Sequence, residues 1–172
     1  MKRRATLALL FCLFSAPAFA LYDPKPDAAL SAVQGEWKGA LTYRDYSKPD
    51  RLVTLPTRLF IALGAPNELV LHYVFDDGPS KTVFSYERMN FDFLKNEIAW
   101  ASGSSEKSVS VGRITSNIVD GSGRKILFER KDGDKLDRYT LELSAGVFKL
   151  SKDEVSADGM STFRNKFEFV RP

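Results

Sequence analysis

The sequence predicts an all-β protein: a single up-and-down antiparallel β-barrel of about eight to ten strands with a short N-terminal helical turn. From Gly35 onward, short runs rich in β-branched and aromatic residues follow one another, as is typical of strands. Turn clusters such as Asp76-Asp77-Gly78-Pro79 and Asp120-Gly121-Ser122-Gly123 separate these runs, which indicates hairpins. A meander hides its edges completely by closing on itself, so a barrel is favoured over a two-sheet sandwich, which needs longer crossovers.

The first 20 residues indicate a signal peptide. Residues 2–4 are basic, residues 5–14 are apolar, and Ala18-Phe19-Ala20 offers a small-x-small cleavage site, an arrangement typical of Sec export. The apolar run is shorter than the roughly 20 residues that a membrane-spanning helix needs. We therefore expect cleavage after Ala20 and a periplasmic or secreted protein.

The mature chain is expected to form a leader and one domain. Residues 21–34 predict an extended leader that ends in a short helical turn, capped by Asp27 because an Asp side chain accepts hydrogen bonds from free N–H groups. Residues 35–172 predict the barrel domain. Removing 20 of the 172 residues leaves 152, the size of one ordinary domain.

The strands follow from alternation and punctuation. The first, at residues 35–46, is the clearest because Trp37, Gly39, Leu41 and Tyr43 alternate with mostly polar residues, a pattern typical of a strand with one buried face. Later runs are bounded by residues that favour turns. They predict strands at 51–63, 69–75, 81–88, 97–101, 108–119, 125–130, 136–143, 147–152 and 161–170.

The composition excludes several function classes. Without residues 1–20 the chain has 22 basic and 22 acidic residues, so it lacks the positive field that nucleic-acid binding requires. Cys12 is the only cysteine and would leave with the signal peptide, so we expect no disulfide and no lipid anchor. An integral outer-membrane barrel is also disfavoured, because strands 125–130 and 147–152 are shorter than the roughly 9–11 residues needed to span a bilayer.

The segment Gly35-Glu36-Trp37 resembles the Gly-x-Trp motif of lipocalins and other calycins. The resemblance implies an up-and-down barrel in which an arginine of the last strand packs across the tryptophan. Arg171 and Arg164 are the candidates for this arginine. Together with Gly35 and Trp37, they are the residues expected to have a structural role. If Phe163, Phe167 and Phe169 point inward, alternation places Arg171 on their face and Arg164 on the opposite face. The chain differs from typical lipocalins because it lacks a disulfide pair and an evident C-terminal helix.

The residue types give little support for catalysis or metal binding. His72 is the only histidine, so histidine-pair metal motifs are excluded. A general base or a haem ligand is conceivable for His72, but a strand histidine bonded to a neighbour is the simpler interpretation. Asp132-Gly133-Asp134 is expected to be a turn, because it lacks the calcium-loop pattern. We expect no catalytic residues, no enzyme activity, no metal site and no cofactor.

The aromatic residues provide the remaining functional signal. About eight strands just fill a barrel with side chains, and more strands leave space for a ligand. We therefore expect an exported, non-enzymatic, lipocalin-like barrel that binds a small hydrophobic or amphipathic ligand. The side chains expected to line the cavity are Leu41, Tyr43, Tyr73, Phe75, Trp100 and Tyr139.

A second hypothesis remains open. The protein could bind an envelope protein through its outer face and loops, as an inhibitor, immunity or assembly factor. Residues 43–51 are rich in Tyr, Arg and Asp, and Tyr and Arg are favoured at binding hot spots. The sequence does not indicate the oligomeric state.

Overall fold

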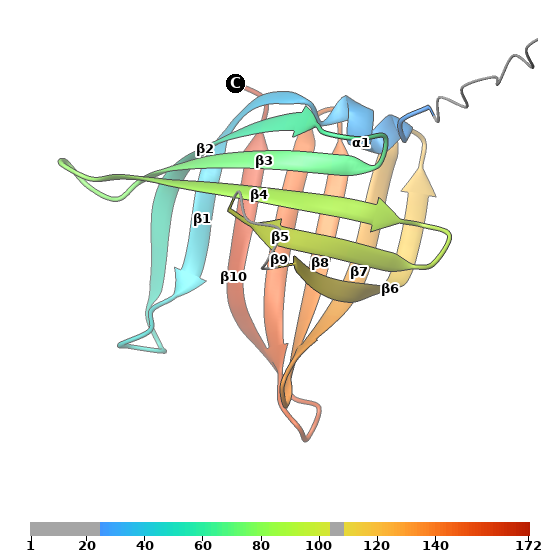
Figure 1. Ribbon diagram of the computed structural model, residues 1–172. Helices are drawn as coiled ribbons and strands as arrows, with labels where there is room; N and C mark the ends of the chain where they lie inside the picture. The colour runs from blue at the N-terminus through green and yellow to red at the C-terminus, as the bar shows by residue number, and fades with distance from the viewer. Residues whose placement is uncertain (1–24, 104–108) are drawn as a thin grey trace, which may run out of the picture.

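A computed structural model describes residues 25–103 and 109–172 and shows a closed barrel of antiparallel strands (Figure 1). Strands adjacent in sequence pair with each other, and β1 pairs with β10 to close the barrel. The predicted up-and-down barrel with one short helix is therefore confirmed, and the sandwich is excluded. The expected signal peptide and residues 21–24 lie outside the described residues.

One helix and ten strands make up the described chain. Helix α1 spans Ala28–Ala32. The strands are β1 Gly35–Arg44, β2 Leu52–Leu63, β3 Glu68–Asp76, β4 Thr82–Asp92, β5 Glu97–Ser102, β6 Val109–Asp120, β7 Gly123–Asp132, β8 Lys135–Ser144, β9 Val147–Val155 and β10 Ser161–Val170.

Several strands are longer than the sequence indicated. β4 continues four residues past the expected end at Arg88, because Met89 and Phe91 extend the inward-facing alternation. The turn comes only after Asp92, whose side chain accepts hydrogen bonds from the backbone of Leu94 and Lys95. β7 and β9 have 10 and 9 residues, so the expectation that they are too short for a membrane barrel was wrong.

The outer face of the barrel is charged over β7–β10. Lys125 pairs with Glu142 at 2.8 Å, and Lys149 lies 3.9 Å from Glu168. A lipid-facing surface would instead present an apolar band. The charged outer face therefore argues against a membrane barrel, whereas the lengths of the strands do not. In residues 25–103 and 109–172, no helix is long and apolar enough to cross a membrane.

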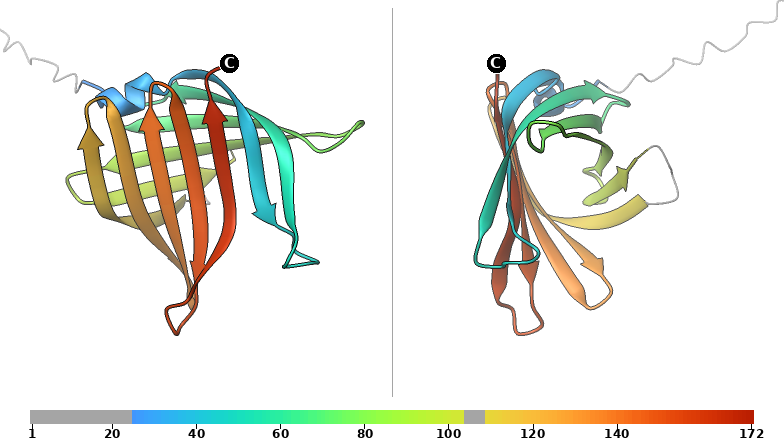
Figure 2. Two further views of the ribbon diagram at one scale, coloured as in Figure 1. Left: turned by 180° about the vertical axis from the view of Figure 1, so that it is seen from behind. Right: turned by 90° about the vertical axis from the view of Figure 1, so that its left-hand side faces the viewer.

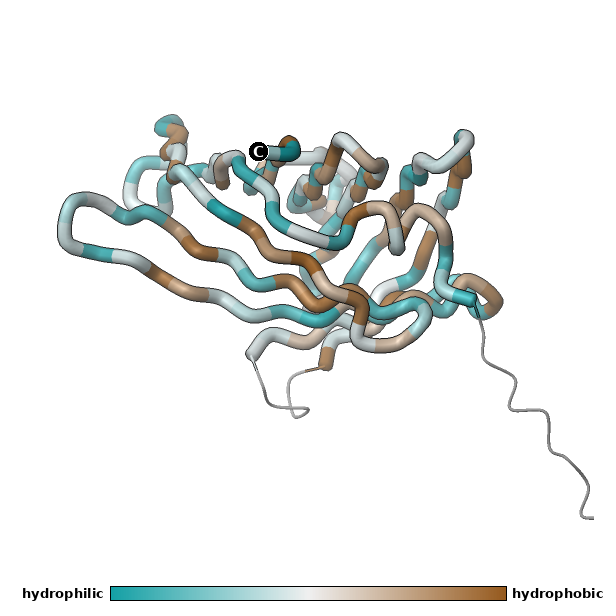
Figure 3. The backbone as a smooth tube through the Cα atoms, turned by 90° about the horizontal axis from the view of Figure 1, so that it is seen from above, coloured by the Kyte–Doolittle hydropathy of each residue, from teal (hydrophilic) through white to brown (hydrophobic). Residues whose placement is uncertain are grey.

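Hydrophilic and hydrophobic residues alternate along the strands, as the colouring of the tube in Figure 3 illustrates, and burial alternates with the same period, for example along β3 and β8. The inward positions of neighbouring strands share one register, for example Leu41 opposite Phe167 and Leu141 opposite Leu150. One continuous hydrophobic core results. Its buried members include Leu59, Leu71, Tyr73, Met89, Phe91, Ile98, Ile126, Phe128, Leu141, Phe148 and Phe169.

Helix α1 covers one end of the barrel, at the top of Figure 1. Asp27 caps it by accepting hydrogen bonds from the backbone N–H groups of Ala29 and Leu30. The other carboxylate oxygen of Asp27 pairs with Arg124 on β7. Leu30 is fully buried, so the helix closes this end both by apolar burial and by an ion pair.

Trp37 and Arg171 meet beneath this helix. Trp37 is fully buried, and its indole N–H donates to the Val33 carbonyl at 2.8 Å. The Arg171 guanidinium carbon lies 4.1 Å from the Trp37 ring centroid. Arg171 also donates to the carbonyls of Ala32 and Ala145, so it ties α1 and the β8–β9 turn to the end of β10.

Gly35 is required at the start of β1. Its φ is +113°, and a Cβ atom built there would lie 2.8 Å from Nη1 of Arg171. Both the backbone conformation and the close approach of the guanidinium therefore favour glycine.

Arg164 lies away from Trp37, at the opposite, open end. A bulge in β10 between Phe163 and Asn165 inserts one residue relative to β9, and such an insertion breaks the alternation of side chains. Phe163 consequently pairs with Asp153 on the outer face, and Arg164 turns inward. The expectation that Phe163 faces inward and Arg164 faces outward was wrong for this reason.

The β3–β4 hairpin projects beyond the barrel (Figures 1 and 2). β2 pairs with β3 only from Thr57 onward, although β2 begins at Leu52. On the other side, β4 pairs with β5 only from Glu87. In the described chain, β3 therefore has a partner strand on both sides as far as Phe75, whereas residues 82–86 of β4 and residues 52–56 of β2 each have a partner on one side only.

We predict that Trp37→Ala lowers the free energy of unfolding by about 3–5 kcal/mol, the usual cost of deleting a buried large aromatic residue. Urea unfolding measures the change. Leu94→Ala is the matched control, because Leu94 is 98% exposed and its loss should change stability by less than about 0.5 kcal/mol. Equal stability of the Trp37 variant and the wild type would contradict the packing described above.

Candidate functional site

A pocket of about 380 Å³ lies at the open end of the barrel. Inward-facing residues of β1, β2, β3, β4 and β10 line it, together with the tip of the β3–β4 hairpin. Its apolar wall consists of Leu41, Tyr43, Leu55, Phe75, Val83 and Phe167, and its polar rim of Tyr46, Asp77, Lys81, Arg164 and Asn165. The pocket is thus apolar on one side and polar on the other.

Three of the side chains expected to line a cavity do so here: Leu41, Tyr43 and Phe75. Tyr73 lies behind them and is fully buried. Its ring centroid is 4.8 Å from that of Phe167. The Tyr73 hydroxyl has no hydrogen-bond partner among the described residues, and burial raises its pKa well above the ordinary value, with a smaller contribution from Glu87.

Trp100 and Tyr139 form a second aromatic cluster on another part of the interior wall. The Trp100 and Tyr139 ring centroids are 5.2 Å apart, and Tyr139 stacks on Phe128 at 4.7 Å. All six expected side chains point into the barrel, but they belong to two clusters and do not surround one cavity.

Glu87 is a half-buried acid beside this second cluster. Its carboxylate accepts a hydrogen bond from the Trp100 indole N–H at 3.2 Å. Burial raises the pKa of Glu87 to about 7, although the Trp100 hydrogen bond and the Arg130 charge oppose the shift. The side chain therefore changes its charge near neutral pH.

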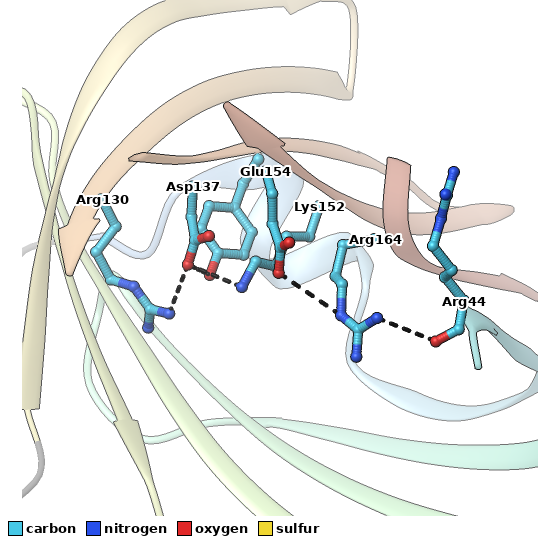
Figure 4. A network of polar contacts seen from close by, with 7 residues as sticks. Arg44, Arg130, Asp137, Lys152, Glu154 and Arg164 are labelled. Atoms are coloured by element: carbon cyan, nitrogen blue, oxygen red, sulfur yellow. Dashed lines mark hydrogen bonds and ion pairs between the residues drawn. The ribbon is translucent and has the colours of Figure 1, made fainter. Parts of the chain in front are cut away.

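A row of charged side chains follows the inner wall across β7, β8, β9 and β10 (Figure 4). Asp137 is its centre and pairs with Arg130 at 3.0 Å and with Lys152 at 2.8 Å. Farther along the row, Arg164 lies 3.6 Å from Glu154 and donates to the Arg44 carbonyl at 3.0 Å. The row contains three cations and two carboxylates.

Asp137 is ionised although its side chain is only 5% exposed. Burial by itself would raise its pKa, but the hydrogen bonds from Lys152 and Arg130 outweigh this and lower the pKa below the ordinary value. The Tyr139 hydroxyl donates to the same carboxylate oxygen at 3.3 Å. One carboxylate therefore compensates two cations at this point of the wall.

The sequence-based expectations did not include Glu87, Arg130, Asp137 or Lys152. The signal was present in the alternation, because Asp137 lies two residues before Tyr139, and Lys152 two residues after Leu150. Both therefore share the inward face of their strands. Charged residues at the ends of apolar faces could have been recognised as the lining of a barrel mouth.

His72 lies on the outer surface and cannot act inside the barrel. Its ring is between those of Phe60 and Phe84, with centroids 6.3 and 6.0 Å away. In the segment Asp132-Gly133-Asp134, Asp132 ends β7, and Gly133, at φ +62°, and Asp134 form the hairpin turn to β8. The described part of the chain has no group of three or more His, Cys, Asp or Glu residues that could hold a metal ion.

Comparisons with known proteins give relatives in fold only. No family model and no curated protein matches the sequence. Among solved structures, Rv2717c from M. tuberculosis is similar with a TM-score of 0.58 and 13% identity, over 86% of this chain and 99% of the other. The S-type phycobiliprotein lyase CPES from Guillardia theta has a TM-score of 0.55 and 8% identity, over 83% and 90%. Both are lipocalin-like barrels.

We predict that stability falls as pH rises toward neutral because of Glu87. The folded protein holds this proton up to about pH 7, whereas the unfolded chain releases it near pH 4.5. Unfolding free energy should therefore decrease between these values, and Glu87→Gln should abolish up to about 3 kcal/mol of that decrease.

Urea titrations at several pH values measure this effect. Glu142→Gln is the control, because Glu142 lies on the outer face and pairs with Lys125. Parallel pH profiles for wild type and Glu87→Gln would show that the Glu87 carboxyl titrates as an ordinary glutamate.

Proposed function

We propose that the protein is a non-enzymatic barrel that binds a small amphipathic ligand in its open end. The pocket of about 380 Å³ carries this proposal. Small-molecule sites are concave, mostly apolar and about 300–1,000 Å³ in volume, with a few polar groups that fix orientation. An apolar wall facing a polar rim suits a ligand with one apolar and one polar part.

The fold alone does not decide between binding and catalysis. One structural neighbour is a phycobiliprotein lyase, but one fold supports many functions. The proposal of a binding protein rests on the interior side chains. His72, the one histidine of the chain, faces outward, so the described wall of the pocket offers no imidazole base.

We also propose that the protein acts outside the cytoplasm. The support is the order of basic residues, apolar run and Ala18-Phe19-Ala20 in the first 20 residues. Expression with this segment should give periplasmic or secreted protein that begins at Leu21, without a lipid adduct. Intact-mass spectrometry of the exported protein tests this, and a retained N-terminus would contradict it.

Ligand binding should depend on the inward face of β4 near the tip of the β3–β4 hairpin. Val83 lines the pocket, whereas Phe84 is its exposed neighbour on the opposite face. We predict that Val83→Trp fills the pocket and weakens calorimetric binding of a twelve-carbon alcohol or carboxylate at least tenfold. Phe84→Trp, the matched control, should bind like the wild type.

Calorimetry is the suitable measurement, because neither Trp37 nor Trp100 is among the residues that line the pocket. If the folded wild type binds no fatty acid, long-chain alcohol, haem or hydrophobic dye saturably, the pocket is not a ligand site.

An exposed aromatic stripe favours a second function, protein binding. Phe60, Phe84 and Tyr86 are exposed on the outer face of β2–β4, with His72 between the two phenylalanines. Aromatic residues are enriched at protein interfaces. Loss of a co-purified envelope protein in Phe60→Ser and Phe84→Ser, with small-molecule binding absent, would support this alternative.

A further inference from the structure

We propose that the pocket ligand carries an anionic head group that binds at Arg164, which makes the ligand an anionic amphiphile; this rests on the proposed binding function. Three features of the site support it: the position of Arg164, its unused hydrogen-bonding capacity and the charges around it.

The β10 bulge fixes the position of Arg164. Without the inserted residue, strand alternation would direct this side chain to the outer surface. With it, Arg164 lines the pocket on the same wall as Asn165 and Phe167. The guanidinium therefore lies where the apolar wall ends, at the place that the head of an amphiphile with its tail against Phe167 and Phe75 would reach.

The guanidinium of Arg164 has hydrogen-bonding capacity left over. Nη1 donates to the Arg44 carbonyl, and Nε faces Glu154 at 3.6 Å, which is longer than a hydrogen bond. Nη2 is buried and has no partner among the described residues. A buried N–H of a cation without an acceptor is unfavourable, and a carboxylate or phosphate oxygen would satisfy it.

The local charge balance also favours an anion. Of the described charged residues that line the pocket, Lys81 and Asp77 pair with each other. Arg164 is left with Glu154, which is 47% exposed, whereas Arg164 is 13% exposed. Because water screens an exposed charge more strongly, Glu154 compensates the buried guanidinium only in part.

Tyr46 covers the site from outside. Its ring centroid is 3.9 Å from the Arg164 guanidinium carbon, yet its side chain is 83% exposed. Displacing an exposed ring loses little buried apolar area. An incoming anionic group can therefore take the place of Tyr46 against the guanidinium.

Calorimetry with dodecanoate and dodecanol at pH 8, below the micellar concentration of dodecanoate and below the solubility limit of dodecanol, tests the inference. The two probes share one tail and differ in head-group charge. Wild type should bind dodecanoate at least tenfold more tightly than dodecanol. Arg164→Gln should reduce this preference to less than twofold, and Arg164→Lys should restore part of it.

Arg58→Gln is the matched control, because Arg58 lies on the outer face near Glu36 and should keep the full preference. Circular dichroism checks that each variant is folded. If Arg164→Gln does not fold, two measurements still test the inference: the preference of the wild type for dodecanoate over dodecanol, and the decrease of this preference in Arg164→Lys.

Equal affinity of wild type for both probes would overturn the head-group inference and leave the binding function standing. An unchanged preference in folded Arg164→Gln would show that another cation holds the head group. Binding of neither probe would overturn this inference, and failure of the wider ligand panel as well would overturn the binding function.

Discussion

Pairing between the first and the last strand is the interaction on which the rest of the structure depends. β1 and β10 pair from Lys38 opposite Val170 to Tyr43 opposite Asn165, and this pairing removes two long exposed edges. The strands approach so closely at Gly39 that a Cβ atom there would lie 1.9 Å from the Glu168 carbonyl oxygen. Because the pairing joins segments more than 120 residues apart, its loop-closure entropy has to be offset by the contacts it completes. Arg171 over Trp37 is one of these contacts.

The closed barrel then separates two kinds of interior. The end under α1 is filled with aromatic and aliphatic side chains such as Trp37, Phe148 and Leu30. The open end holds the charged row, where partial exposure to water reduces the cost of desolvating ions. Stability therefore comes chiefly from the closed end. At the open end the barrel holds charged and polar side chains in its interior, which a fully apolar core would exclude.

Alternation in the sequence was enough to predict the strands, the barrel and the inward direction of residues such as Leu41, Tyr73 and Trp100. Alternation did not show how deeply each side chain is buried, because an inward-facing apolar residue can lie either in the packed core or in the pocket. It also failed at β10, since a one-residue bulge leaves no mark in the pattern around Arg164. The charged interior was missed for a related reason: at a barrel mouth, polar residues such as Asp137 occupy inward positions.

The two walls of the pocket differ in how firmly they are held. Arg164 and Phe167 belong to β10, which pairs with β9 and β1 on its two sides. Val83 belongs to the part of β4 that pairs with β3 alone, and Leu55 belongs to the part of β2 that pairs with β1 alone. Segments held by fewer neighbours open at lower free energy. A ligand with its head group at Arg164 thus meets a fixed wall at its polar end and a more adaptable wall along its apolar part. This arrangement favours selectivity for the head group and tolerance of different tails.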